Sequence, residues 1–83
     1  MTQDHTELAK TILIDARGLN CPLPVLKLRK MLKGLRPGTD VELLATDRAA
    51  LRDVPAFCWA HGYSVQVFDE PESLRFCIGK VDG

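Results

Sequence analysis

The sequence predicts an α/β fold of the α+β type: a two-layer sandwich in which two helices cover one face of a four-stranded mixed sheet. Apolar residues recur at every second position in short stretches, as in strands, and every three to four positions in longer ones, as in helices. The order along the chain is β-α-β-α-β-β. Because crossover connections between parallel strands are right-handed, both helices are expected on the same face.

The first half of the chain supplies two strands and a helix. Residues 11–15 are a short apolar run rich in β-branched side chains, and residues 41–46 alternate as a second strand. Helical spacing begins at Pro22, and the dipeptide Pro37-Gly38 is expected to end that helix. Its apolar positions are Val25, Leu28, Leu32 and Leu35. Asp47 is expected to cap the helix that follows the second strand.

The second half adds a helix and a hairpin. We expect the helix to break and restart at Asp53-Val54-Pro55, because a proline inside a continuous helix removes a hydrogen bond. The helix is expected to end at His61-Gly62. Residues 63–69 and 73–80 then form two strands, joined across the turn Glu70-Pro71-Glu72.

Alternation also predicts the face of the sheet that each strand residue occupies. The residues expected to face the helices are Ile12, Ile14, Val41, Leu43, Val65, Val67, Leu74, Phe76 and Ile78. Those expected to form an apolar stripe on the open face are Leu13, Leu44, Phe68 and Cys77. The stripe is either a weak association surface or ordinary exposed apolar area, and we expect a monomer.

Length and composition indicate one soluble domain. The chain has 83 residues, 46% of them hydrophobic, with 11 basic and 11 acidic residues. Residues 1–10 are polar and aperiodic and are expected to be a flexible tail before a single domain over residues 11–83. Since there is neither a leader-like N-terminus nor a run of about 18 apolar residues, we expect a cytoplasmic protein that does not engage a membrane.

Positive charge is concentrated in one segment, because no acidic residue lies between Asp15 and Asp40. The basic residues there are Arg17, Lys27, Arg29, Lys30, Lys33 and Arg36. The segment is either a solvated helix face, whose later bases suit the helix C-terminus, or a docking surface for an acidic partner or a nucleic acid. Trp59 is likewise either a partner contact or a cover at the rim of the core.

The three cysteines, at positions 21, 58 and 77, cannot all pair within one chain. Cys58 shares the inner face of the second helix with Val54 and Phe57, so we expect it to be buried and inert. Cys58 and His61 have the spacing of two metal ligands but lack a further pair, so neither a metal site nor a cofactor is expected.

Cys21 is the candidate reactive residue. It follows a strand and the loop residues Gly18 and Asn20, at the expected N-cap of the first helix. The positive end of a helix favours a thiolate, so the pKa of Cys21 is expected to be lowered.

Two prolines define what Cys21 can do. Pro22 and Pro24 have no backbone N–H but fix the backbone and pre-organise the thiol. The first-turn donors left for the sulfur are those of Leu23 and Val25. Pro24 also occupies the place of the second cysteine of a Cys-x-x-Cys motif, which excludes a local dithiol cycle. The remaining chemistry uses one cysteine, as a mixed disulfide, a sulfenic acid or a persulfide.

The chain after residue 10 resembles the TusA (SirA-like) sulfur-carrier family. The resemblance rests on Asp15-Ala16-Arg17-Gly18-Leu19-Asn20-Cys21-Pro22-Leu23-Pro24, Arg29, Pro37-Gly38, Asp47 and Asp53-Val54-Pro55-Ala56-Phe57-Cys58. It implies the same sandwich with strand order 1-2-4-3, and partner docking at Arg29 and Asp47, to which the neighbouring Lys27 and Lys30 are added as candidates.

The resemblance also implies a cytoplasmic carrier rather than an autonomous turnover enzyme. Such a carrier receives sulfane sulfur as a persulfide on Cys21, from a cysteine desulfurase or a rhodanese-type donor, and hands it to a downstream acceptor protein. In the best-known branch of the family the sulfur reaches the 2-thiouridine of tRNA. Oxidative sulfur metabolism and cofactor synthesis are the alternatives.

Two other functions stay open. A small nucleic-acid-binding or regulatory module would use the basic segment, although no aromatic residues are interleaved with the bases, so direct nucleic-acid binding is not expected. A thiol-redox protein would use Cys58 and Cys77 with Cys21, and it needs thiols close enough to pair. A hydrolase is not expected, because no histidine lies near Cys21 in the sequence.

Overall fold

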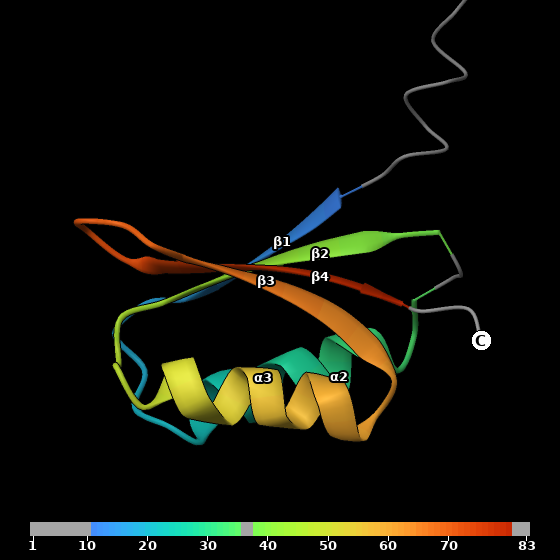
Figure 1. The fold of residues 1–83 in the computed structure, drawn as a ribbon, viewed down its shortest axis with the longest axis horizontal. Helices are drawn as coiled ribbons and strands as arrows, with labels where there is room; N and C mark the ends of the chain where they lie inside the picture. The colour runs from blue at the N-terminus through green and yellow to red at the C-terminus, as the bar shows by residue number, and fades with distance from the viewer. Residues whose placement is uncertain (1–10, 36–37, 81–83) are drawn as a thin grey trace, which may run out of the picture.

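The computed structural model describes residues 11–35 and 38–80, so the expected tail over residues 1–10 lies outside the described part of the chain. Four strands and two helices follow one another in the predicted order (Figure 1). They are β1 (Thr11–Ala16), α2 (Leu23–Leu32), β2 (Asp40–Ala45), α3 (Ala50–Ala60), β3 (Tyr63–Asp69) and β4 (Leu74–Lys80). Within these residues, neither helix is long and apolar enough to cross a membrane.

The strands form one mixed sheet in the order β1-β2-β4-β3, as predicted. Strands β1 and β2 are parallel, and β4 runs antiparallel to both β2 and β3. Both helices lie on one side of the sheet (Figure 1). Because β1 and β2 are parallel and end in register at Ala16 and Ala45, the loops that follow them meet at the same end of the sheet. The candidate site lies at this end, where the two strands finish.

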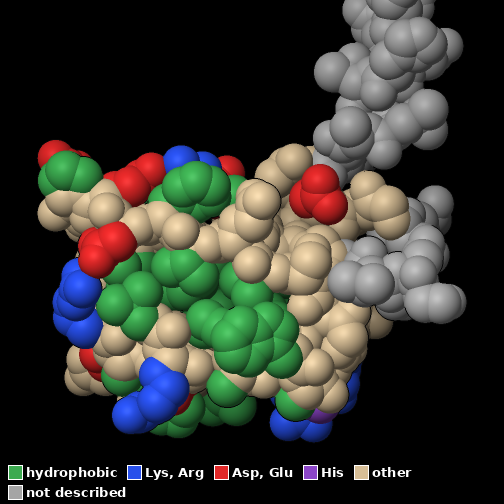
Figure 2. Space-filling model, in the orientation of Figure 1, with side chains coloured by type: hydrophobic (Ala, Val, Ile, Leu, Met, Phe, Trp, Pro, Cys, Tyr) green, Lys and Arg blue, Asp and Glu red, His purple; other side chains and the backbone are tan. Residues whose placement is uncertain are grey.

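The core lies between the sheet and the two helices. Its fully buried residues include Ile14, Val41, Leu43, Leu74, Phe76 and Ile78 from the sheet, Leu28 from α2, and Val54 and Cys58 from α3. Val67 departs from the prediction: it is opposite Phe76 and so faces the helix side, yet it is 40% exposed, because β3 is an edge strand. Figure 2 shows hydrophobic side chains gathered between β3 and α3 at this edge.

The predicted apolar stripe on the open face is not continuous. Across the strands, Glu42 separates Leu13 from Cys77. One row along, Arg75 separates Leu44 from Phe68. The Arg75 guanidinium bonds the carboxylate of Glu70 at 2.7 Å and lies 4.5 Å from the centre of the Phe68 ring. Alternation placed these apolar residues on the correct face, but charged neighbours interrupt them.

Helix α3 runs through Pro55 without the predicted break. Its first turns form normally, since the N–H of Asp53 bonds the carbonyl of Ala49 at 3.0 Å. Pro55 is buried together with Val54 and Cys58, so core packing offsets the hydrogen bond that the proline cannot make. The predicted restart at residues 53–55 is therefore wrong.

Helix α2 ends at Leu32, earlier than the predicted stop at Pro37-Gly38. Beyond it, the N–H groups of Gly34 and Leu35 bond carbonyls three residues back, those of Met31 and Leu32, which tightens the backbone into a turn. Leu35 still packs against the core, so the apolar spacing was correct for burial although not for the helix boundary.

Candidate functional site

Cys21 lies in the loop between β1 and α2, two residues before Leu23, the first residue of the helix. The N-cap of α2 is Pro22, so the prediction that Cys21 is the N-cap is wrong by one position. Gly18 turns the chain at the end of β1 with a φ of +83°, a conformation that favours glycine. The Cys21–Pro22 peptide bond is cis.

Of the two first-turn donors that the sequence suggested for the sulfur, the N–H of Leu23 is already bonded to the backbone. The N–H of Leu23 donates to the carbonyl of Asn20 at 2.9 Å, which closes the turn that contains Cys21. The N–H of Leu26 donates to the carbonyl of Pro22 at 3.0 Å. The donor of Leu23 is thus used by the backbone, which weakens the expected stabilisation of a thiolate by the helix end.

The two prolines have different surroundings. The side chain of Pro24 is fully buried, so it anchors the start of α2 in the core. Pro22 is exposed beside Cys21. Together with the fixed φ angle of a proline ring, this leaves Cys21 on a rigid segment at the surface.

The loop after β2 holds the Cys21 loop in place through two hydrogen bonds. The N–H of Gly18 donates to Oγ1 of Thr46 at 2.9 Å, and the N–H of Cys21 donates to Oδ2 of Asp47 at 2.9 Å. The other carboxylate oxygen, Oδ1, accepts the N–H of Ala49 at 3.0 Å. These two N–H donors lower the pKa of Asp47.

These contacts change the role expected for Asp47. The N-cap of α3 is Ala49, so Asp47 caps the turn that leads into α3 and not the helix itself. Both of its oxygens are engaged with the backbone, and one of them reaches Cys21. Sequence analysis did not identify Thr46, because its bond to Gly18 joins residues 28 positions apart.

The surroundings of the sulfur raise the pKa of Cys21, contrary to the expectation. Burial contributes most, since Cys21 is partly buried and packs against the core. The negative charges of Asp47 and Asp53 add to it, and the positive charge of Arg52 opposes it. Arg52 is itself paired with Asp53, Nε to Oδ1 at 3.2 Å, and is well exposed. These surroundings therefore favour the protonated thiol of Cys21 over its thiolate.

The basic segment is divided between paired and exposed side chains. Arg17 pairs with Asp15 at 2.8 Å, which lowers the pKa of Asp15 to about 2. Nζ of Lys27 donates to the backbone carbonyl of Asp15 at 3.1 Å. Arg29 and Lys30 are exposed on α2. Arg36, which was counted with this segment, lies outside the described residues.

Sequence analysis missed two exposed apolar residues beside Cys21. Leu23 is 48% exposed and Leu26 is 50% exposed. The sequence indicated this exposure, because Leu23 and Leu26 are three residues apart and lie outside the helical spacing of the buried residues Pro24 and Leu28. They share the outer surface of α2 with the basic side chains. This surface, called the outer face of α2 below, consists of Leu23, Leu26, Lys27, Arg29 and Lys30.

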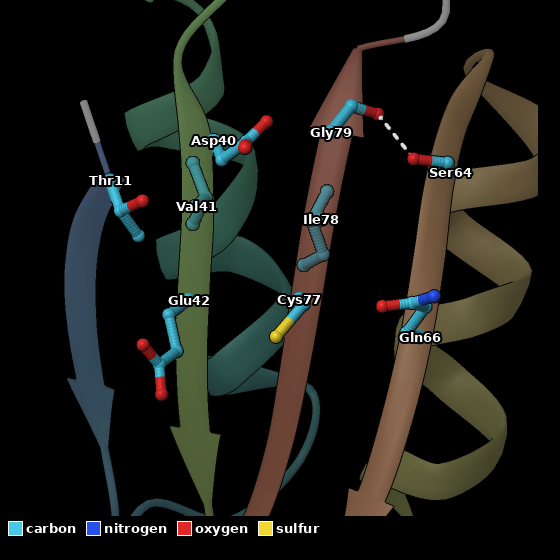
Figure 3. A pocket seen from close by; sticks show the side chains of 9 residues that line it. All are labelled: Thr11, Asp40, Val41, Glu42, Ser64, Gln66, Cys77, Ile78 and Gly79. Atoms are coloured by element: carbon cyan, nitrogen blue, oxygen red, sulfur yellow. Dashed lines mark hydrogen bonds between the residues drawn. The ribbon is translucent and has the colours of Figure 1, made fainter. Parts of the chain in front are cut away.

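The other two thiols lie on α3 and β4. Cys58 is fully buried, which raises its pKa to about 11 and confirms that it is a core residue. Cys77 is partly buried on the open face of the sheet, where it borders a hollow of about 460 Å³ with Glu42 and Gln66 (Figure 3). Nη1 of Arg75 lies 3.8 Å from its sulfur.

His61 and Trp59 were candidates for a metal ligand and a partner contact. The His61 ring lies against the Phe57 ring, with 4.5 Å between centroids. Across residues 11–35 and 38–80, no three His, Cys, Asp or Glu side chains are grouped so that they could hold a metal ion. Trp59 is 72% exposed, which excludes the rim-cover interpretation and leaves the partner contact as a prediction.

Known proteins and a family model resemble this chain over most of its length. The family model described as "Sulfurtransferase TusA" matches residues 12–80. Proteins named "Sulfur carrier protein TusA" from Pseudomonas paraeruginosa and Pseudomonas aeruginosa are each 42% identical over 69 residues, covering 82% of this chain and 87% of theirs. A crystal structure of a SirA-like protein from Desulfitobacterium hafniense superposes with a TM-score of 0.71 at 24% identity, covering 81% of this chain and 92% of that one. That last likeness concerns the fold alone.

Proposed function

This chain belongs to the TusA family of sulfur carriers, and we propose that it carries sulfur as a persulfide on Cys21. The observation that carries the proposal is the different placement of the three thiols. Cys21 lies on a rigid loop at the surface, beside the exposed outer face of α2. Cys58 is enclosed in the core, and Cys77 is on the far side of the sheet.

The proposed step is a thiol exchange. The Cys21 thiolate attacks the outer sulfur of a donor persulfide, R–S–SH, and the donor S–S bond breaks as the new S–S bond forms. The products are Cys21–S–SH and a donor thiolate, which takes up the proton that Cys21 released. Atoms and electrons balance without an oxidant. The same exchange in reverse sense, with an acceptor thiolate as the attacking group, unloads the carrier.

The absence of a resolving thiol at position 24 favours a relay between proteins. Pro24 is buried where a second cysteine of a local pair would stand, so Cys21–S–SH has no neighbouring thiol to discharge it. We propose that a cysteine desulfurase or a rhodanese-type protein donates the sulfur in the cytoplasm. The acceptor we propose is a relay protein that leads to the 2-thiouridine of tRNA, with other sulfur pathways as the alternative.

The outer face of α2 is the proposed docking surface for these partners. It combines exposed leucines next to Cys21 with exposed cations, and apolar contacts ringed by charge are typical of transient interfaces. A partner with an acidic rim around its own reactive sulfur fits this face. Lys27 is held toward the Cys21 side of the helix by its bond to the carbonyl of Asp15.

The proposal is tested by loading the purified protein. After incubation with a cysteine desulfurase and cysteine, the intact mass should rise by one sulfur atom per chain. Cyanide, which removes sulfane sulfur as thiocyanate, should return the mass to its starting value. The variant Cys77→Ser should load like the native chain. If neither a desulfurase nor a rhodanese-type donor adds sulfur that cyanide can remove, the chain is not a carrier of this kind.

A further inference from the structure

The carboxylate of Asp47 touches the reactive loop in a way that docking alone does not explain. We propose that Asp47 is a positioning residue for the sulfur chemistry: it fixes the backbone of Cys21, and its negative charge makes the thiol a poorer nucleophile in the free protein. This inference deepens the proposed function and rests on it for its biological meaning, although its chemical content concerns the thiol alone.

The positioning half rests on the two hydrogen bonds of the carboxylate. Oδ2 accepts the N–H of Cys21 and Oδ1 accepts the N–H of Ala49, at 2.9 and 3.0 Å. One side chain therefore ties the Cys21 loop to the start of α3, across 26 positions of sequence. The neighbouring bond from Gly18 to Thr46 makes a second tie to the same loop. Because both oxygens are engaged, the carboxylate is held beside the backbone of Cys21.

The electrostatic half rests on the balance of charges around Cys21. Burial is the largest cause of the raised pKa of the Cys21 thiol. The carboxylates of Asp47, from the loop after β2, and Asp53, from α3, add to it, and the guanidinium of Arg52 opposes it. Oδ2 of Asp47 lies 2.9 Å from the backbone nitrogen of Cys21, so this charge is held close to the residue. Arg52 is exposed and already paired with Asp53, so its effect on the sulfur is weak.

This arrangement suits a carrier whose empty form must avoid side reactions of its thiol. A protonated thiol is slow to react with oxidants and alkylating agents, because the thiolate is the nucleophile.

The test is the pH profile of Cys21 alkylation, which involves no sulfur donor and so stands apart from the loading experiment. Iodoacetamide labelling is followed by peptide mass spectrometry in Asp47→Asn and Asp47→Ser, both of which keep an oxygen for the N–H of Ala49 without the charge. Asp40→Asn, an exposed carboxylate at the opposite end of β2, is the matched control. A thermal melt confirms that each variant is folded.

We expect the midpoint of the Cys21 profile to fall in both Asp47 variants, with labelling at pH 7 faster by roughly threefold or more. Asp53→Asn should also lower the midpoint, and Asp40→Asn should not. An unchanged or raised midpoint in a folded Asp47 variant would overturn the electrostatic half of the inference.

A measurement on the native chain tests the positioning half without any variant. In an NMR titration toward acid, the amide signals of Cys21 and Ala49 should move together, with a midpoint below the ordinary range of an aspartate, because both N–H groups bond one carboxylate. The amide of Gly18, bonded to a hydroxyl, should not follow that titration. If the Cys21 amide does not follow it, the hydrogen bond does not hold the loop, and this half fails.

Discussion

Cys58 and Cys77 lie on opposite sides of the sheet. Cys58 is on the inner face of α3, fully buried between the helix and the strands. Cys77 is on β4, opposite Glu42 and Gln66, and faces away from the helices. The sheet therefore separates the two sulfur atoms, and the Cα to Cα distance of about 4–7 Å that a disulfide needs cannot be reached without unfolding.

Mild oxidation of the folded protein should consequently give no disulfide between Cys58 and Cys77. With oxidised glutathione we expect mixed disulfides to form slowly at Cys21 and at Cys77, and none at the buried Cys58, as measured by intact mass and peptide mapping. Recovery of a Cys58–Cys77 cross-linked peptide from protein that was oxidised below its unfolding transition would show that the thiol-redox function has a structural basis after all.

Alkaline pH should destabilise the fold through Cys58. Its pKa of about 11 lies above that of an exposed thiol, about 8.5, so the folded state favours the neutral form. The stability from this group is complete below about pH 8.5 and is lost as the pH rises toward 11, because the unfolded chain ionises first. Urea unfolding between pH 8 and 11 should show this loss, and Cys58→Ala should lack that part of it.

Two phenylalanines of adjacent strands provide a matched test of the core. Phe76 is fully buried, whereas Phe68 is 39% exposed on the open face. Phe76→Ala should lower the free energy of unfolding by about 3–5 kcal/mol, a large part of the total for a chain of this size. Phe68→Ala should lower it by about 1 kcal/mol or less, mainly through the lost contact with Arg75. Equal losses in denaturant unfolding would contradict the placement of the core.

The outer face of α2 should control the rate of loading rather than its extent. Replacing Arg29 and Lys30 by Gln should slow sulfur uptake from a desulfurase by about twofold or more at low salt, because rim charges act mainly on association. The control replaces Arg48 and Arg75 by Gln, which removes the same charge from side chains paired elsewhere.

Initial rates over a series of desulfurase concentrations separate the two variants. The Arg29/Lys30 double variant should regain the native rate as the donor approaches saturation, and its defect should shrink as salt is added. A defect of the same size in the Arg48/Arg75 control would mean that net charge matters and that the outer face of α2 is not the docking surface.

The order of strands and helices could be predicted from the spacing of apolar residues. The details depended on contacts between elements, which that spacing does not describe. The alternation in β4 fixed the inward side chains of Leu74, Phe76 and Ile78 correctly. At Pro55 the local rule predicted a break, yet burial of the proline in the core preserved a continuous helix. Local rules describe one element at a time, and packing between elements decided this case.

The candidate site shows the same division. The sequence identified Cys21 and its prolines from their position after a strand. It did not predict that the pKa of the thiol is raised, because burial and the carboxylates of Asp47 and Asp53 cause this shift. Those carboxylates come from a loop and a helix that follow β2, and the parallel pairing of β1 with β2 brings them to the same end of the sheet as Cys21. Reasoning from the helix end alone therefore gave a lowered pKa where the assembled surroundings raise it.

The most direct test of the account is the site of sulfur loading in single-thiol chains. A Cys58→Ala/Cys77→Ser variant retains Cys21 alone, and a Cys21→Ser variant retains the other two thiols. After incubation with a cysteine desulfurase and cysteine, the first should gain one sulfur atom, mapped to Cys21 by peptide mass spectrometry, and the second should gain none. Loading of Cys21→Ser at Cys58 or Cys77, or a Cys21-only chain that stays unloaded while the native chain loads, would contradict the assignment of Cys21 as the carrier residue.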